Sequence, residues 1–268
     1  MTITVGYISD LHIEFRGKKF MNIVKMKTDV LCLAGDICAC GNKKDYENFL
    51  LFLKMICSNY KYVIHVAGNH EYYTAGESKI TKWHTMQGIN ARLKSIEKII
   101  PNYIYLDCQS AILKINGSSY VFIGATLWAH VNKNNYEEIE KRMNDYNYIY
   151  IWKDGKPVKL TIQDMQKLHA KHTKFLASAI HKFKGMPCIV VTHHKPVRDS
   201  INCDVITQAY ETDMTDIIGM EGSTVKYAIH GHTHSHYSKI IKGIHYLSNP
   251  KGYIGEHTKF IDNISIKV

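Results

Sequence analysis

Long apolar runs are absent from this 268-residue sequence, and no stretch approaches the roughly 20 consecutive apolar residues that a membrane-spanning helix needs. The N-terminus, Met1 to Tyr7, also lacks the basic segment, the apolar segment and the small-residue cleavage site of a secretory signal peptide. It predicts a strand instead. We therefore expect a cytoplasmic protein that has no membrane partner.

Cysteines at the spacing of a disulfide framework are also missing. The sequence has seven cysteines, an odd number, and Cys32, Cys57, Cys108 and Cys188 lie in apolar runs that are typical of small core residues. We therefore expect reduced thiols. Cys38-Ala39-Cys40 forms a C-x-C motif, but no second cysteine pair completes a zinc site, so a metal role for this motif is the less favoured interpretation.

Acidic residues are outnumbered, with 24 Asp and Glu against 34 Lys and Arg, which gives a formal net charge of +10. This balance favours anionic partners, either phosphorylated small molecules or nucleic acid. The positive charge is nearly all lysine and is scattered, so it does not choose between them. A hydrophobic content of 45% is ordinary for a folded protein, and the length fits one elaborated domain over residues 1–268.

Short runs rich in Val and Ile alternate with longer segments of helical spacing. The expected strands are Ile3–Ser9, Val30–Ala34, Tyr62–Ala67, Cys188–Thr192 and Val225–Ile229, and the expected helices are Asp45–Asn59, Ser78–Ile99, Asn135–Tyr148 and Thr161–Phe183. Two hairpins are expected, with turns at Asn116-Gly117 and Lys242-Gly243. This order predicts an α/β fold whose largely parallel sheet is covered by helices and extended by antiparallel strands. Residues 128–184 predict an inserted helical cap or rim.

Polar residues collect where the predicted strands end. The sequences at these ends are Asp10-Leu11-His12, Gly35-Asp36, Gly68-Asn69-His70-Glu71, Thr192-His193-His194-Lys195-Pro196 and His230-Gly231-His232-Thr233-His234. Because the carboxyl ends of strands in open α/β sheets are where sites form, we expect one cluster of side chains. Glu71 either supports that cluster or caps the next helix.

The ligand types in this cluster define its chemistry. Carboxylate oxygens, imidazole nitrogens and an amide oxygen suit divalent metals such as Mn²⁺, Fe, Zn²⁺ or Ni²⁺. There are too many ligands for one tetrahedral zinc ion, but enough for two ions if one carboxylate bridges them. Two ions about 3.5–4 Å apart favour in-line displacement at phosphorus.

In this order, the motifs D-x-H, G-D, G-N-H-E, H and G-H-x-H resemble those of the calcineurin-like metallophosphoesterase superfamily, from Asp10 to His234. The resemblance implies a β-sandwich of two mixed sheets flanked by helices. It also implies an enzyme with two divalent metal ions, Mn²⁺ being the first choice in vitro, that hydrolyses a phosphomonoester or phosphodiester by attack of metal-bound hydroxide.

The resemblance also implies a role for each motif residue. The ligands of the first ion would be Asp10, His12 and His234, and those of the second Asn69, His232 and one histidine of the 193–194 pair. Asp36 would bridge both ions, and His70 would stabilise the transition state or protonate the leaving oxygen. His194 is preferred in the pair because family members usually place the ligand two residues before a proline, here Pro196. The alternative is His193 as the ligand and His194 as a substrate contact.

The motifs depart from the family pattern after Asp36. Protein phosphatases of the superfamily continue G-D with x-x-D-R, which supplies a phosphate-binding arginine and a partner for the motif histidine. Here Ile37-Cys38-Ala39-Cys40 follows, which disfavours that class and leaves the partner of His70 unidentified. The tyrosine ligand of purple acid phosphatases is not evident either.

Two further segments, Gly124–Trp128 and Met143–Tyr146, resemble a subgroup found in bacteria and their phages, which also tends to carry T-H-H-x-P. The residues that could line a substrate pocket are Tyr73, Trp128, Tyr146 and Arg198, of which the arginine offers a bidentate phosphate contact.

Three functions remain open from the sequence. The leading hypothesis is hydrolysis of a phosphate ester on a small molecule or nucleotide. The second is a metal-dependent nuclease or a phosphatase acting on nucleic-acid ends, although no concentrated Lys/Arg stripe supports it. The third is a non-catalytic scaffold, which is disfavoured because every ligand position is filled. Neither the substrate nor the oligomeric state follows from the sequence.

Overall fold

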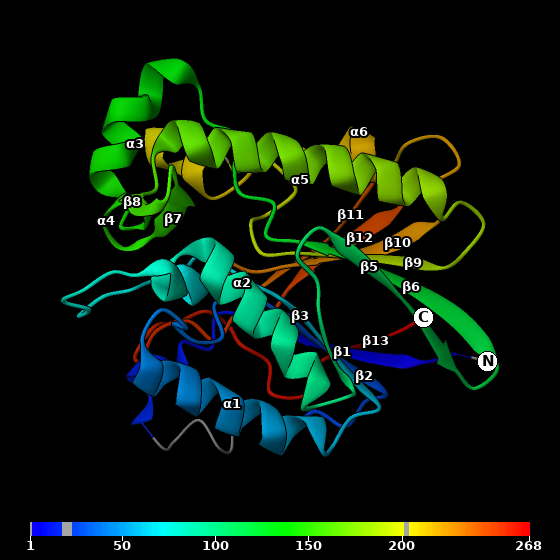
Figure 1. Cartoon of the computed structure of the whole chain (residues 1–268). Coiled ribbons are helices and arrows are strands. Elements are labelled where there is room, and N and C mark those ends of the chain that lie inside the picture. Colours follow the sequence, from blue (N-terminus) through cyan, green and yellow to red (C-terminus); the bar gives the residue numbers. More distant parts are fainter. Residues whose placement is uncertain (1, 18–22, 201–203) are drawn as a thin grey trace.

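Two mixed β-sheets lie face to face at the centre of the molecule (Figure 1). The computed structural model describes residues 2–17, 23–200 and 204–268. The first sheet has the order β13-β1-β2-β3-β4 and the second β11-β12-β10-β9-β6-β5. The strands of the first are β1 Thr4–Ile8, β2 Val30–Ala34, β3 Tyr62–Val66, β4 Tyr103–Tyr105 and β13 Ser265–Lys267. Those of the second are β5 Gln109–Ile115, β6 Ser118–Ala125, β9 Cys188–Thr192, β10 Val225–His230, β11 Tyr237–Ile241 and β12 Ile244–Ser248.

The central strands of both sheets are parallel, and antiparallel strands lie only at the edges. Strands β1 to β4 run parallel and β13 is antiparallel to β1. In the second sheet β12, β10, β9 and β6 are parallel, and β11 and β5 are the antiparallel edges. Both predicted hairpins are confirmed. Their turn residues Asn116-Gly117 and Lys242-Gly243 have positive φ, as the tight turn between twisted strands requires.

The central strands of each sheet are buried on both faces, which explains their continuous apolar runs. Between the sheets, residues such as Tyr7 and Val66 pack against Phe122, Val191 and Ile229. On the outer face of the first sheet lie α1 (Lys43–Cys57) and α2 (Met86–Ser95), and on that of the second lie α5 (Ile162–Lys182) and α6 (Thr215–Ile218) (Figure 1). The predicted α/β sandwich of two mixed sheets flanked by helices is confirmed.

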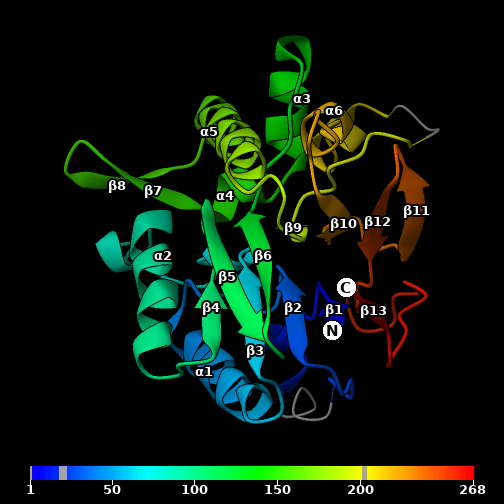
Figure 2. The ribbon, with the colours of Figure 1, turned by 90° about the vertical axis from the view of Figure 1, so that its right-hand side faces the viewer.

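The segment predicted as a helical cap, residues 128–184, divides into two parts with different packing. The buried face of α5 packs on the second sheet through Leu176, Ala179 and Ile180, so this helix is part of the core layer. The remainder forms α3 (Tyr136–Arg142), α4 (Asp145–Tyr148) and the hairpin β7 (Tyr150–Lys153)–β8 (Lys156–Lys159). These elements gather at the end of the molecule opposite both termini (Figures 1 and 2). A capping role for them stays a prediction.

Two predicted helices are shorter in the structure. The expected helix Asn135–Tyr148 is interrupted because Met143 has an extended backbone, which ends α3 before α4 begins. In the expected helix Ser78–Ile99, the Thr85 side chain accepts a hydrogen bond from the Gly88 N–H and so starts α2 late. Short 3-10 helices complete the fold at Ile13–Phe15, His70–Tyr72, Lys82–His84, Ile96–Lys98, Lys133–Asn135 and Val205–Ala209. In the described part of the chain, no helix combines the length and apolarity needed to cross a membrane.

Candidate metal centre

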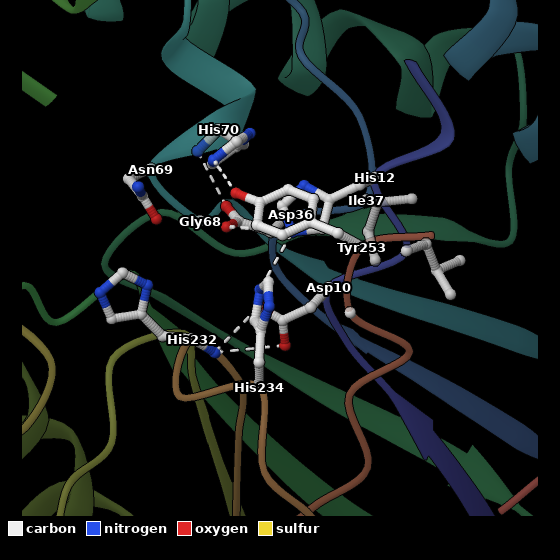
Figure 3. Close-up of polar contacts among 12 residues, drawn as sticks. Asp10, His12, Asp36, Ile37, Gly68, Asn69, His70, His232, His234 and Tyr253 are labelled. Carbon is white, nitrogen blue, oxygen red and sulfur yellow. Dashed lines mark hydrogen bonds and ion pairs between the residues drawn. The ribbon is translucent and has the colours of Figure 1, made fainter. Parts of the chain in front are cut away.

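The strand ends predicted to form a site do converge, at the edge where the carboxyl ends of both sheets meet. Strands β1, β2 and β3 of the first sheet precede Asp10, Asp36 and Asn69, and strands β9 and β10 of the second precede His193 and His232. The close-up view shows side chains from both sheets pointing toward one another (Figure 3). Asp10, Asp36 and His193 are at most 2% exposed.

The first group of potential ligands comprises Asp10, His12, Asp36 and His234. The Nε2 atoms of His12 and His234 are 3.1 Å apart, and His234 Nε2 lies 3.4 Å from Asp10 Oδ1. Ligands of one ion, each about 2.0–2.2 Å from it, lie about 3.0–3.5 Å from one another. The spacing in this group therefore fits a common cation.

The hydrogen bonds behind these histidines strengthen that conclusion. His12 Nδ1 faces the Glu14 carboxylate at 3.4 Å, and His234 Nδ1 faces the Glu256 carboxylate at 2.7 Å. Since a carboxylate only accepts, both Nδ1 atoms carry a hydrogen, and in the neutral form of each ring, the form that binds a metal, Nε2 presents a lone pair. Two lone pairs at 3.1 Å repel each other, and a cation between them removes the repulsion. Carboxylates behind ligand histidines are typical of metal sites.

The second group comprises Asp36, His193 and His232, together with the amide oxygen of Asn69. His193 Nε2 lies 3.1 Å from both Asn69 Oδ1 and His232 Nδ1, and 3.4 Å from Asp36 Oδ1. The Nδ1 atom of His193 donates to the Ala34 carbonyl at 2.9 Å, so Nε2 carries no hydrogen when the ring is neutral. This lone pair also faces acceptors, and the donor set of carboxylate, imidazole and amide oxygen suits a divalent cation.

Asp36 connects the two groups. Its Oδ1 faces His193, whereas its Oδ2 lies 3.9 Å from His12 Nε2. Burial disfavours the charge of Asp36, but His193, His70 and His12 hold its pKa well below the ordinary value. Conversely, although burial opposes charge on His193, the Asp36 carboxylate raises its pKa to about 10. The carboxylates therefore demand positive charge, which protons supply when a metal does not.

The structure places His193, rather than the preferred His194, beside Asp36 and His232. The Nδ1 atom of His194 faces the Thr126 carbonyl at 3.3 Å, and its ring packs between Trp128 and His232 with centroid distances of 5.2 and 4.1 Å. His194 thus lies behind the second group rather than in it. The direction in which β9 ends determines that His193 points between the sheets, and the metal ligand among the two histidines stays a prediction.

Glu71 supports the loops that carry the site. Its carboxylate accepts the backbone N–H groups of Asp36, Ile37 and Gly68 at 2.9, 2.7 and 2.6 Å. A Cβ atom at Gly68 would clash with the Asp36 carboxylate and the His193 ring, which explains the glycine of G-N-H-E. Of the two interpretations of Glu71, support of the site is the correct one.

The backbone at the site is strained in a way that is uncommon outside functional regions. Positive φ angles of 53°, 44°, 53°, 69° and 49° occur at Asp10, His12, Asp36, His232 and His234. The five residues all belong to the two potential metal-binding groups. The surrounding hydrogen bonds, such as His232 N–H to Asp10 Oδ1 at 3.0 Å, maintain these conformations.

Two carboxylates that sequence reasoning missed hold the side chains of the G-N-H-E motif. Glu14 Oε1 lies 3.3 Å from His70 Nδ1 and is the partner that the departure after Asp36 had left unidentified. Burial opposes its charge, but hydrogen bonds from His12 and His70 lower the pKa of Glu14 to about 2, so it is ionised. Asp145 accepts hydrogen bonds from Asn69 Nδ2 and Tyr73 Oη at 2.8 and 2.7 Å, which turns the Asn69 oxygen toward the metal-binding group.

A cavity of about 330 Å³ opens over the two groups. Of the predicted pocket residues only Tyr73 lines it, with its ring stacked on His70 at 4.2 Å. Trp128 and Tyr146 are core residues, and the exposed Arg198 donates to the His130 and Glu211 carbonyls. The lining residues missed from the sequence include Arg142, Tyr210, Tyr253 and Glu256.

The C-x-C motif takes no part in the site. Cys38 Sγ and Cys40 Sγ are buried and donate to the carbonyls of Asp45 and Cys38, both at 3.3 Å. The cysteines in the described residues are free thiols. Cys203 lies outside the described residues.

Comparison with known proteins agrees with this geometry. The family model described as calcineurin-like phosphoesterase matches residues 3–236, which contain both metal-binding groups. The chain belongs to this family. As a calcineurin-like phosphoesterase it is a hydrolase of phosphate esters, and its clustered carboxylates and histidines are able to hold metal ions.

Two proteins illustrate how far this calcineurin-like phosphoesterase resembles others. An uncharacterized protein of Acanthamoeba polyphaga mimivirus is 29% identical over 272 aligned residues, which cover 95% of this chain and 92% of that protein. The crystal structure of a phosphopantetheinyl hydrolase from Mycobacterium tuberculosis superposes with a TM-score of 0.71 at 16% identity, covering 93% of this chain and 89% of that one. At this identity the second likeness shows a common fold.

Proposed function

We propose that the protein is a dinuclear metallophosphoesterase that hydrolyses a phosphorylated small molecule or a nucleotide. In this proposal the first ion is held by Asp10, His12 and His234, the second by Asn69, His193 and His232, and Asp36 is shared between them. The observation that carries the proposal is the approach of potential ligand atoms to 3.1 Å in both groups, at His12–His234 and at His193–Asn69.

The metal ions define the chemistry of the proposal. When bound, two divalent cations supply a hydroxide nucleophile near neutral pH and neutralise the charge on the phosphoryl oxygens. Mn²⁺ is our first choice for assays, with Fe, Zn²⁺ and Ni²⁺ as alternatives, because all of them accept mixed oxygen and imidazole ligands.

The chain itself positions the substrate and its leaving group. Glu14 and the ring of Tyr73 fix His70, so that His70 Nε2 faces Tyr253 at the wall of the cavity. We assign His70 to stabilise the transition state or to protonate the leaving oxygen. Arg142, the last residue of α3, lines the cavity and offers the charge for a phosphoryl oxygen that the metal ions leave free.

The dimensions of the cavity favour a small substrate. A volume of about 330 Å³ is at the lower end of the range of roughly 300–1,000 Å³ for small-molecule sites. This favours a phosphorylated small molecule or nucleotide over duplex nucleic acid. We propose a cytoplasmic setting, in which free thiols persist.

The test is a substrate panel assayed with each metal ion. It contains p-nitrophenyl phosphate, bis-p-nitrophenyl phosphate, nucleotides, a phosphopantetheinyl ester, and labelled single- and double-stranded oligonucleotides. We expect turnover of a small ester in the presence of Mn²⁺ and loss of turnover with a chelator. Cleavage of oligonucleotides alone would favour the nuclease, and no hydrolysis by metal-loaded protein would favour the scaffold.

A further inference from the structure

Tyr253 lies directly over the metal-binding groups, yet it belongs to none of the sequence motifs and follows the last residue matched by the family model (Figure 3). Its ring stacks on the His12 ring at a centroid distance of 4.4 Å and meets the His234 ring edge-on at 4.9 Å. Its hydroxyl lies 3.1 Å from His70 Nε2. The phenol therefore spans the gap between the first metal-binding group and His70.

The segment around Tyr253 is fixed at several points. The backbone N–H groups of Lys251 and Gly252 donate to the carbonyls of Ser9 and Asp10 at 3.0 and 2.9 Å. The N–H of Tyr253 donates to Glu256 Oε2 at 2.7 Å, the same oxygen that faces His234 Nδ1. A ring held in this way over a polar cluster is not a packing residue, because 42% of Tyr253 stays exposed.

The environment of His70 shows which group a substrate meets. His70 is only 8% exposed, since Glu14 holds Nδ1, the ring of Tyr73 covers one face and the backbone N–H donates to Asp36. The remaining polar atom, Nε2, is occupied by the hydroxyl of Tyr253. A leaving-group oxygen that approaches His70 from the cavity must therefore contact Tyr253.

The hydrogen-bond directions allow that contact without movement of the ring. Because a Glu14 oxygen takes the Nδ1 hydrogen, Nε2 of a neutral His70 ring accepts from the Tyr253 hydroxyl, whereas a protonated ring donates its Nε2 hydrogen to the Tyr253 oxygen and leaves the hydroxyl hydrogen free. The hydroxyl hydrogen turns about the C–O bond, so it is able to leave His70 and point at an oxygen atom in the cavity. An oxygen about 3 Å from both atoms contacts His70 and Tyr253 together.

We propose that Tyr253 is a further catalytic residue of this phosphoesterase, whose hydroxyl donates a hydrogen bond to the leaving-group oxygen as negative charge develops on it. This inference rests on the proposed function. A donor aimed at developing charge typically contributes about 10²- to 10³-fold to kcat. The benefit is large for an alkoxide and small for p-nitrophenolate, because p-nitrophenolate disperses its charge into the ring.

The experiment compares wild type and Tyr253→Phe on two esters of the same phosphate class, one with an alkyl and one with a p-nitrophenyl leaving group. We expect kcat on the alkyl ester to fall about 100-fold and kcat on the nitrophenyl ester less than about threefold. Bound metal per chain, measured by elemental analysis, stays at the wild-type value. The matched control is Tyr227→Phe, which removes a hydroxyl that donates to the distant Lys267 carbonyl and leaves both rates unchanged.

The outcomes separate this inference from the proposed function. If wild type is active and Tyr253→Phe loses the same factor on both esters, or loses nothing, the hydroxyl does not act on the leaving group and the inference is wrong. If metal-loaded wild type hydrolyses neither ester nor any other member of the panel, the proposed function is wrong, and the inference falls with it.

Discussion

His193 Nε2 lies 3.1 Å from Asn69 Oδ1, and when the His193 ring is neutral neither atom has a hydrogen to share with the other. The His193 hydrogen is on Nδ1, which donates to the Ala34 carbonyl, and the Asn69 amide group donates to Asp145. Two acceptors held this close by separate strands are stabilised by a proton or by a metal ion that takes its place. This pair is the basis for proposing the second metal ion.

The first prediction follows from this pair. His193→Ala removes a ligand whose partners converge on one point, so we expect Mn²⁺ content to fall from two ions per chain toward one and activity to fall at least about 100-fold. His194→Ala is the matched variant in the same motif and keeps both ions, because His194 Nδ1 faces a carbonyl behind the site. Elemental analysis after gel filtration measures both. The reverse pattern would restore His194 as the ligand.

The second prediction separates metal binding from catalysis at adjacent positions. Asp36→Ala disturbs both ions, since each carboxylate oxygen faces one group, and it costs most of the activity. His70→Ala leaves both ions bound while kcat falls by about 10²-fold or more. Calorimetric titration with Mn²⁺ and steady-state kinetics provide the two readouts. Equal metal loss in both variants would show that His70 has been misassigned.

The third prediction concerns the buried Glu71 carboxylate, which accepts three backbone N–H groups from the loops that carry Asp36 and Asn69. Glu71→Gln exchanges one acceptor oxygen for an N–H₂ group that faces donors. We expect the free energy of unfolding to fall by about 2–4 kcal/mol, as for a lost charge-assisted hydrogen bond with a donor left buried. Urea denaturation measures it, with the exposed Glu221→Gln as control. A change below about 0.5 kcal/mol would contradict the role given to Glu71.

The fourth prediction tests the cavity wall. Arg142 lines the cavity. Its guanidinium also donates hydrogen bonds of 3.0–3.1 Å to the exposed carboxylates of Glu138 and Asp204. Arg142→Ala should raise KM about tenfold and change kcat little, since it removes binding that is equal in the ground and transition states. Lys141→Ala, which removes the neighbouring exposed cation, is the control. An unchanged KM would remove Arg142 from the substrate site.

Sequence patterns located the strand ends well because the motif residues follow short apolar runs directly. Asp10, Asp36 and Asn69 each follow a single strand, and because these three strands are parallel, their carboxyl ends lie at one edge of the sheet. The alternation along β9 also distinguishes His193 from His194, which the distance to Pro196 does not take into account. Ile189 and Val191 of β9 face the core between the sheets, and His193 continues that alternation toward the site.

The residues missed from the sequence are those placed by tertiary contacts. Glu14 stands two residues after His12, and its carboxylate could have been a candidate partner for His70 from that spacing alone. Asp145 reaches the site from the first residue of α4, and Tyr253 and Glu256 reach it from an irregular segment, and no local pattern in the sequence defines these directions. Trp128 and Arg198 were chosen for their chemistry, but packing directs the first into the core, and backbone carbonyls hold the second away from the cavity.

The most direct test of the account is electron paramagnetic resonance of Mn²⁺-loaded protein, combined with its metal content. The account predicts two Mn²⁺ ions per chain and the exchange-coupled spectrum of a bridged pair, which becomes the spectrum of isolated Mn²⁺ in Asp36→Ala. A single bound ion per chain, or two ions without magnetic coupling in the wild-type protein, would contradict a centre in which the two ions share Asp36.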